Sequence, residues 1–523
     1  MQSESRWARA AAVGVPAAVM AVIGAWDLGR GGMWRDEGVT FQVARRSVPQ
    51  IWRLLHGVDA VHGLYYLLMH AVLALRADEV ALRLPSVCGA TAAAALVGAL
   101  GTRLAGAWAG CGAGLLYAVT PMVGYYAQEG RSYALVSAGV LAATLLLARA
   151  VDGQGVWRAY AVVLGVTCLL HELAALAVCA HALTLACARV RRGVWGRWSC
   201  AVGAAGAVTL PLALVSRAQS GQVAWLRTPG WASAGRLLSA SVPVPTGVLF
   251  WGCVALALLG VCAGPRTLTR VALPLALAPP ALLIAVSRLR PLYDDRYVLY
   301  ALAGMPLLTA GGCAALLTAA RRAARRRATG APTRPRDPGH AGARSRALVL
   351  PGAVALVLGL ALVAVVGVAL PPHRADRADA RRPDDLGALS GAAARQVRPG
   401  EPVLFLPAIG RRAALAYPAG FAAARDVALR EPAALSGTLY GREVDAVELR
   451  RRLAGAHRLW VVAERYALRP GPPPADAAER AKLALLRREF TPAGPLPRPA
   501  PGGAILRLYV RRGEGTTARG GGR

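Results

Sequence analysis

The chain has 523 residues, 55% of them hydrophobic, and a mean hydropathy of +0.41. Several apolar runs reach the roughly 20 residues that cross a bilayer, which excludes a purely soluble protein. The formal net charge of +33 would indicate nucleic-acid binding in a soluble protein. In a membrane protein the placement of basic residues reports orientation instead, so we expect a polytopic helical membrane protein without a nucleic-acid partner.

About eleven apolar segments are candidate membrane spans, the first of them an uncleaved N-terminal span. They lie at residues 8–28, 81–102, 107–125, 132–150, 158–170, 173–189, 199–216, 245–263, 271–287, 297–319 and 348–370. A further stretch, residues 62–76, is short and is interrupted by His62 and His70. We interpret it as a helix that lies at the membrane interface.

The arginines predict the orientation. With the N-terminus inside and 62–76 interfacial, the inner loops collect most of the arginines, including a linker at residues 321–347. Residues 321–346 contain nine arginines and one acid, Asp337, and we expect a disordered cytoplasmic segment. Counting 62–76 as a span would reverse this arrangement. We therefore predict a multi-pass protein of the plasma membrane, with the last span at 348–370 leading outside.

A small α/β domain is expected at residues 371–510, on the outer face, followed by a disordered tail at 511–523. Buried strands are predicted at 402–408, 458–464 and 502–510, and helices at 445–456 and 476–490. The segment has no Gly-rich phosphate loop and no nucleophile elbow, so we interpret it as accessory to a catalytic membrane domain at residues 1–320.

Polar side chains that could carry chemistry converge on the predicted outer face. They are Asp36, Glu37, Asp59, His62, Gln128, Glu129, Arg131, His171, Glu172, Tyr293, Asp294, Asp295 and Arg296. Adjacent acids such as Asp36 and Glu37 commonly occupy a helix N-terminus. These two acids lie beside the bilayer, where an ionisable group is energetically costly and often has a function. We therefore expect one of them to act as a general base that deprotonates a hydroxyl acceptor.

The other polar groups allow two interpretations each. One group consists of Asp59, His62 and Tyr66, which could form a capped helix start with an aromatic belt, or could line one wall of the outer-face cavity. A second group consists of Gln128 and Arg131, which could form an ordinary polar turn or belong to the same functional site. The pair His171–Glu172 suits a tight turn better than a metal site, because two ligands do not hold an ion. A divalent metal ion is therefore left open.

Three arginines on the predicted outer face, Arg288, Arg290 and Arg296, break the orientation rule. Binding of an anionic lipid phosphate would explain them, through bidentate charge-assisted hydrogen bonds. Asp294 and Asp295, which lie among them, would cap the following span or line the same cavity.

Five motifs occur along the chain in the order "WRDEGVT", "DAVHGLYYLLMH", "ALRLPS", "YYAQEGRSYAL" and "YDDRYVLY". In this order they resemble the family 39 type of GT-C glycosyltransferases, relatives of the protein O-mannosyltransferases and the lipid A aminoarabinose transferase. The resemblance covers residues 1–320 and is strongest to mannosyltransferase-like membrane proteins of actinobacteria. It implies a GT-C fold, a polyprenyl-phosphate-linked sugar donor, a hydroxyl acceptor on a protein, glycan or lipid, and inversion at the anomeric carbon.

The resemblance also implies roles for particular residues. Asp36 matches the general base, with Glu37 beside it, and Glu129 matches an acid that orients a substrate. Arg131 and Arg296 are candidates for the donor phosphate, with Tyr297 adjacent. At His62 the chain departs from the family, because some relatives have a "KPP"-like sequence where this chain has "VHGLYY".

Two other classes of function remain open. A transporter or lipid flippase would be expected to show inverted repeats and charged or broken helices at the membrane midplane, and the spans read as plainly apolar. A non-catalytic scaffold that presents residues 371–523 would leave the outer-face cluster unexplained.

Overall fold

The computed structural model describes residues 5–223, 225–244, 247–329, 340–377, 384–469, 474–495 and 504–513. The chain forms two compact units, each assembled from two stretches of sequence. The first unit comprises residues 1–28 and 83–375, and the second comprises residues 29–82 and 376–523.

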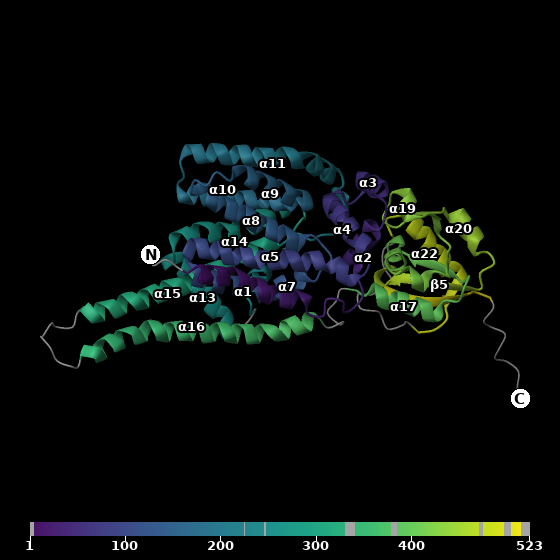
Figure 1. Ribbon diagram of the computed structural model, residues 1–523. Coiled ribbons are helices and arrows are strands. Elements are labelled where there is room, and N and C mark those ends of the chain that lie inside the picture. The colour runs from purple at the N-terminus through teal and green to yellow at the C-terminus, as the bar shows by residue number, and fades with distance from the viewer. Residues whose placement is uncertain are drawn as a thin grey trace, which may run out of the picture. The chain divides into compact units, whose positions relative to one another are not determined.

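The first unit consists mainly of apolar helices, most of which are labelled in Figure 1. Their bounds are α1 Arg6–Ala25, α5 Glu79–Ala105, α6 Ala107–Ala118, α7 Pro121–Ala127, α8 Tyr133–Val151, α9 Trp157–Leu170, α10 Ala177–Ala188, α11 Arg192–Ala218, α12 Trp231–Ala240, α13 Gly247–Ala263, α14 Arg266–Ser287, α15 Gly304–Thr329 and α16 His340–Asp376. The 3-10 helices η2 (Glu172–Leu176), η3 (Ser220–Val223) and η4 (Asp295–Ala303) connect some of them.

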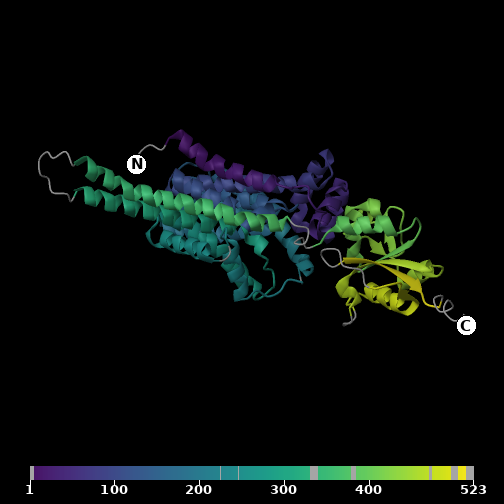
Figure 2. The same cartoon turned by 90° about the horizontal axis from the view of Figure 1, so that it is seen from below.

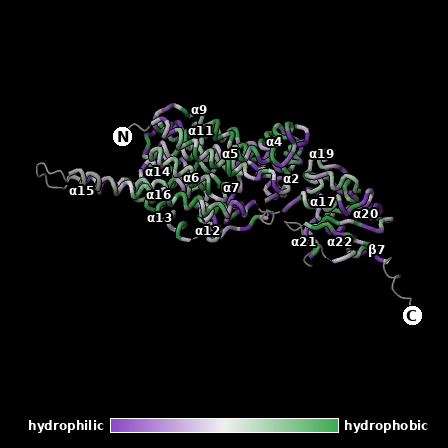
Figure 3. Tube along the Cα trace, turned by 60° about the horizontal axis from the view of Figure 1, so that its bottom comes forward, coloured by the Kyte–Doolittle hydropathy of each residue, from purple (hydrophilic) through white to green (hydrophobic). Residues whose placement is uncertain are grey.

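Within the described residues, seven helices are long and apolar enough to cross a membrane. They span Arg6–Ala25, Glu79–Ala105, Tyr133–Val151, Arg192–Ala218, Arg266–Ser287, Asp295–Arg326 and Pro351–Asp376. Shorter apolar helices lie at Ala60–Leu75, Trp157–Leu170, Glu172–Ala188 and Gly247–Ala263. Each apolar segment that we predicted as a span is mainly helical over its described residues. Three of these segments are each divided into two helices, namely 107–125, 173–189 and 297–319. Figure 3 shows hydrophobic colour along these helices and hydrophilic colour mainly at their ends.

Small residues allow the helices of the first unit to approach closely. A side chain at Gly260 of α13 would meet the carbonyl oxygen of Leu308 at 2.1 Å, and one at Gly312 of α15 would meet that of Leu256 at 1.9 Å. Glycine at these two positions lets the backbones of α13 and α15 touch, as is common between helices in a bilayer.

One polar chain of hydrogen bonds crosses the apolar interior of the first unit. His181 on α10 contacts Thr144 Oγ1 at 3.0 Å and the Tyr160 hydroxyl at 2.8 Å, and Trp198 Nε1 donates to that hydroxyl at 3.1 Å. These side chains come from α8, α9, α10 and α11. The interior is therefore less uniformly apolar than the sequence indicates. These hydrogen bonds link four helices at a place from which water is excluded.

The Arg-rich linker is helical at both ends. Helix α15 continues to Thr329 and α16 begins at His340, and the two run in opposite directions in Figure 2. The expected disorder is therefore wrong for residues 321–329 and 340–347, since alanine and arginine are both strong helix formers. Residues 330–339 lie outside the described part of the chain.

The N-terminal part of the second unit is a group of short helices. They are α2 Arg35–Ala44, α3 Val48–Gly57, η1 Ala60–His62 and α4 Gly63–Leu75. Apolar side chains of α2, α3 and α4 form one buried cluster, to which Val43, Ile51 and Tyr66 contribute. We expected residues 29–82 to belong with the membrane domain, whereas they form a compact unit together with the C-terminal domain.

The C-terminal domain contains a five-stranded mixed sheet of order β2-β1-β5-β7-β6, with a separate β3-β4 pair. Its strands are β1 Pro402–Leu406, β2 Arg425–Asp426, β3 Leu429–Glu431, β4 Arg442–Glu443, β5 Arg458–Glu464, β6 Phe490–Pro492 and β7 Ala504–Arg511. Its helices are α17 Leu386–Gln396, α18 Arg412–Ala416, α19 Ala433–Ser436, α20 Ala446–Leu453, α21 Arg465–Leu468 and α22 Ala477–Glu489, with η6 Ala408–Arg411 and η7 Pro418–Phe421. Strand β1 is parallel to β2 and β5, and β7 is antiparallel to β5 and β6. The predicted strands and helices are confirmed.

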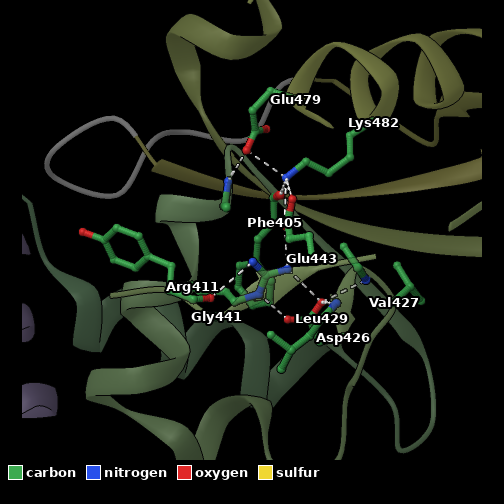
Figure 4. Close-up of polar contacts among 12 residues, drawn as sticks. Phe405, Arg411, Asp426, Val427, Leu429, Gly441, Glu443, Glu479 and Lys482 are labelled. Carbon is green, nitrogen blue, oxygen red and sulfur yellow. Dashed lines mark hydrogen bonds and ion pairs between the residues drawn. The ribbon is translucent and has the colours of Figure 1, made fainter. Parts of the chain in front are cut away.

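A buried ionic network stabilises this domain, and Figure 4 shows Glu443 between Lys482 and Arg411. Lys482 Nζ contacts Glu479 Oε1 at 3.0 Å, Glu443 Oε2 at 2.8 Å and the carbonyl oxygen of Phe405 at 3.0 Å. Arg411 contacts Glu443 Oε1 at 2.8 Å and binds Asp426 through Nε at 2.5 Å and Nη2 at 3.1 Å. Each buried cation thus faces a carboxylate, as a low-dielectric interior requires.

Candidate active site

Helix α2 presents the two adjacent acids in its first turn. Asp36 is half-buried, whereas Glu37 is 1% exposed. The side chain of Glu37 turns back toward the start of its helix, where its Oε2 accepts the N–H of Trp34 at 3.4 Å. Glu37 therefore caps the helix N-terminus, as one half of a capping box does. Asp36 remains the better placed of the two for chemistry.

The segment after α3 brings Asp59, His62 and Tyr66 together within the second unit. The Tyr66 hydroxyl donates to Asp59 Oδ2 at 2.7 Å, and the His62 and Tyr66 rings lie 6.0 Å apart. Asp59 has a left-handed backbone with φ of 59°, which aspartate tolerates better than most residues. His62 and Tyr66 are buried, and the structure brings these three residues together.

The turn between α7 and α8 holds three of the predicted residues in the first unit. Gln128 Nε2 donates to the carbonyl oxygens of Gly24 at 2.9 Å and Trp26 at 2.6 Å, which satisfies the C-terminal end of α1. Glu129 and Arg131 are 3% and 7% exposed. Their backbone carbonyl oxygens both accept the hydroxyl of Ser86 on α5, at 2.6 and 2.9 Å, so this hydroxyl fixes the turn.

Arg296, at the start of η4, lies against aromatic rings. Its guanidinium carbon is 5.4 Å from the centre of the Tyr133 ring and 5.6 Å from that of Tyr297. Asp294 Oδ2 lies 3.4 Å from Arg296 Nε and orients the guanidinium. His171 completes this group, with its ring centre 5.1 Å from that of Tyr297 and 5.7 Å from that of Tyr133.

We call Arg131, Tyr133, His171, Arg296 and Tyr297 the arginine–aromatic cluster. Burial of His171, together with the positive charges of Arg131 and Arg296, lowers the pKa of its imidazole to about 3. His171 is therefore neutral at physiological pH. Its Nδ1 accepts the backbone N–H of Leu173 at 3.4 Å, which assigns the ring proton to Nε2. The imidazole can thus donate a hydrogen bond to an anion without carrying charge.

The remaining predicted residues lie at the edge of this region. Arg290 is exposed in the turn after α14. Asp295 pairs with Arg236 of α12 across 3.8 Å, and nearby Tyr293 is 6% exposed. Burial is the main factor that raises the pKa of the Tyr293 hydroxyl above its ordinary value, so it remains protonated.

Sequence reasoning missed several residues that position the site. Arg83 of α5 is fully buried, and its Nη1 donates to the carbonyl oxygen of Leu28 at 2.9 Å. A single arginine inside an apolar span was the available signal, since such a residue needs a partner. Asp384 carries no comparable local signal because it lies in a charge-rich stretch, and Arg236 carries none because it lies outside the predicted spans.

The predicted site residues are divided between the two units. The second unit contains Asp36, Glu37, Asp59, His62 and Tyr66, and the first contains Gln128, Glu129, Arg131, His171, Arg290, Asp295, Arg296 and Tyr297. Over the described ranges of the chain, no group of three or more His, Cys, Asp or Glu side chains is arranged to hold a metal ion.

Comparison with solved structures identifies the fold. The chain aligns with ArnT from Cupriavidus metallidurans in the apo state at a TM-score of 0.57 and 13% identity, over 95% of this chain and 97% of that one. It aligns with the same protein bound to undecaprenyl phosphate at a TM-score of 0.56 and 13% identity, over the same shares of both chains. The expected GT-C fold is thereby confirmed.

A further alignment is weaker. Arabinosyltransferase EmbB from Mycobacterium smegmatis matches at a TM-score of 0.40 and 15% identity, over 72% of this chain and 40% of that one. No protein-family model matches the sequence, and no curated protein matches it.

Proposed function

We propose that this chain is a membrane glycosyltransferase, which transfers a sugar from a polyprenyl-phosphate donor to a hydroxyl acceptor on the outer face of the membrane. Asp36 is the general base, and the anomeric carbon is inverted. Mannose is the favoured sugar, by the resemblance of the motifs. The acceptor is a protein, glycan or lipid hydroxyl.

The arginine–aromatic cluster is the observation that carries this proposal. The guanidinium of Arg296 lies over the rings of Tyr133 and Tyr297. A guanidinium can bind phosphate bidentately through its N–H groups. Arg131 adds a second cation near the neutral ring of His171. A fold shared with a protein that has been solved with undecaprenyl phosphate supports a polyprenyl-phosphate donor, and we assign the phosphate of that donor to this cluster.

The reaction balances with these groups. The acceptor oxygen forms a bond to the anomeric carbon while the bond from that carbon to the phosphate oxygen breaks. The acceptor proton passes to the Asp36 carboxylate, and the electron pair leaves with polyprenyl phosphate, whose charge a cationic side chain stabilises. Since the leaving group is already activated, no nucleotide-binding loop is needed.

Transfer by purified protein tests the proposal. The protein would be reconstituted in lipid with a panel of radiolabelled polyprenyl-phosphate sugars, mannose first and arabinose next, alongside the variant Asp36→Asn. We expect transfer by the wild type and a loss of at least about 100-fold in the variant, as is typical for removal of a general base.

Asp152→Asn is the matched control, because it makes the same change at an exposed acid paired with Arg103. It should leave transfer unchanged. Equal activity of Asp36→Asn and the wild type would remove Asp36 as the base. No transfer from any donor would overturn the enzyme proposal in favour of a flippase or a scaffold.

A further inference from the structure

The N-cap position of α2 is occupied by a residue that cannot cap it. Trp34 stands there, and an indole side chain donates hydrogen bonds but does not accept them. The backbone N–H of Arg35 instead donates to Asp384 Oδ1 at 2.6 Å, and its Nε donates to Asp384 Oδ2 at 3.0 Å. Asp384, from the C-terminal domain, thus places a carboxylate at the positive end of the helix dipole.

The loop before α2 is attached to the same domain. The N–H of Met33 donates to the Tyr417 hydroxyl at 2.8 Å, and the carbonyl oxygen of Met33 accepts the N–H of Leu386 at 3.0 Å. Gly32 packs so closely that a side chain there would meet Asp385 Oδ1 at 2.1 Å. The Tyr417 hydroxyl also donates to Glu79, at the start of α5.

The other end of α2 is held in a similar way. Gln42 Nε2 donates to the carbonyl oxygen of Leu439 at 3.1 Å. Arg46, which is 5% exposed, donates to the carbonyl oxygen of Thr438 at 2.9 Å and to Gln42 Oε1 at 2.6 Å. Both ends of the helix are therefore fixed to the C-terminal domain, within one compact unit.

Asp384 is itself anchored to the sheet of this domain. Its side chain is 3% exposed, and Arg412 Nη2 lies 3.7 Å from its Oδ2. Arg412 begins α18 after β1 and also pairs with Glu464, the last residue of β5. The ends of two parallel strands are thus connected through Arg412 and Asp384 to Arg35, the residue that precedes Asp36.

We propose that the C-terminal domain holds the Asp36 helix in its reactive orientation, with Asp384 as the positioning residue. The catalytic part of this inference rests on the proposed function, because it takes Asp36 as the base. A base must hold its geometry closely, and a misplacement of about 1 Å can cost about 100-fold in rate. The domain is then part of the catalytic apparatus rather than only an accessory to it.

Two matched Asp→Asn variants test this. Asp384→Asn removes the charge that holds α2, whereas Asp426→Asn removes a comparable partner of Arg411 in the same domain without touching α2. Hydrogen–deuterium exchange of the amides of residues 35–44 would be measured in each full-length variant. The kcat and the KM for the polyprenyl-phosphate sugar would be measured in parallel.

For Asp384→Asn we expect exchange in the first turn of α2 to rise about tenfold, because the ion pair with Arg35 and the negative charge at the positive end of the helix dipole are both lost. We expect kcat to fall about 10- to 100-fold, with a KM within twofold of the wild type, because the donor phosphate is assigned to other residues. Asp384→Glu, which keeps the carboxylate, should recover most of the activity. Asp426→Asn should lower thermal stability but leave kcat and α2 exchange unchanged.

Unchanged α2 exchange in Asp384→Asn, or equal losses of kcat in both Asn variants, would overturn the inference. If Asp384→Asn does not fold, Tyr417→Phe is used in its place, because it removes the hydroxyl that accepts the N–H of Met33. Exchange of the α2 amides and kcat in this variant then test whether the C-terminal domain positions α2. If the wild type transfers no sugar, the proposed function fails, whereas α2 exchange still decides whether Asp384 holds the helix.

Discussion

The guanidinium carbon of Arg296 lies 5.4 Å from the centre of the Tyr133 ring, and Asp294 approaches its Nε to 3.4 Å. The ring and the carboxylate both restrict the movement of this side chain. Its side chain is only 11% exposed. An arginine held in this way loses little further conformational freedom on binding an anion, which favours a phosphate contact over a surface charge.

Replacement of Arg296 by lysine should separate the effect of the positive charge from that of the planar guanidinium. Arg296→Lys keeps the charge but loses the planar fork and the stacking, so we expect kcat/KM for the polyprenyl-phosphate donor to fall roughly 10- to 100-fold. Arg103→Lys, at an exposed ion pair with Asp152, is the matched control and should change nothing. Steady-state kinetics in lipid would check both, and an unaltered kcat/KM in Arg296→Lys would remove it from the donor site.

His171 should make the stability of the protein depend on pH. Its folded pKa of about 3 lies below the ordinary value of 6.5, so between these values the unfolded chain binds more protons than the folded one. Stability is therefore lost as the pH falls through 6.5 toward 3, by about 1–2 kcal/mol at pH 5. Thermal unfolding at pH 7.5 and pH 5 would show a smaller destabilisation in His171→Gln. An equal pH effect in both proteins would contradict the assignment.

The strands and most of the helices could be predicted because their signals are local. The run "RLWVVAE" reads as a buried strand and forms β5, and the apolar runs read as helices. Asp384 could not be placed, because the residues that it contacts are far away in sequence. It lies in a Pro- and charge-rich stretch that read as a domain boundary, and its partner Arg35 lies 349 positions earlier.

The site was predicted in its parts but not in its internal contacts. The sequence points to Arg296, Tyr297 and His171 one at a time, and their common contact with Tyr133 depends on how η4 and α8 pack. The sequence gives no signal for His181, because one histidine in an apolar run has no distinguishing pattern. Its partners Tyr160 and Trp198 lie on other helices, so tertiary packing alone reveals them.

Asp59 and Tyr66 offer a test of the second unit. Tyr66→Phe removes the hydroxyl that donates to Asp59 Oδ2 and should cost about 1 kcal/mol of stability. Asp59→Asn keeps an acceptor and tolerates the left-handed backbone, whereas Asp59→Val should be worse than either by about 1 kcal/mol or more. Thermal unfolding would rank the variants.

Tyr466→Phe, at a residue that is 63% exposed in the same unit, is the control for the loss of a tyrosine hydroxyl. It should leave the unfolding temperature unchanged. If Asp59→Val proves as stable as Asp59→Asn, the left-handed conformation at this position is not a constraint on the fold.

The predicted topology places the Arg-rich end of α15 and the C-terminal domain on opposite sides of the membrane. Single cysteines at Arg325→Cys and Asp476→Cys, in a background without the nine native cysteines, would be labelled with a membrane-impermeant thiol reagent. We expect labelling of Asp476→Cys in intact cells, and of Arg325→Cys after permeabilisation only, because arginine-rich loops remain in the cytoplasm.

Labelling of both cysteines from the same side would show that residues 348–370 do not span the membrane. A reversed pattern would make 62–76 a span, and would move the arginine–aromatic cluster to the cytoplasmic face, where the proposed reaction could not occur as described.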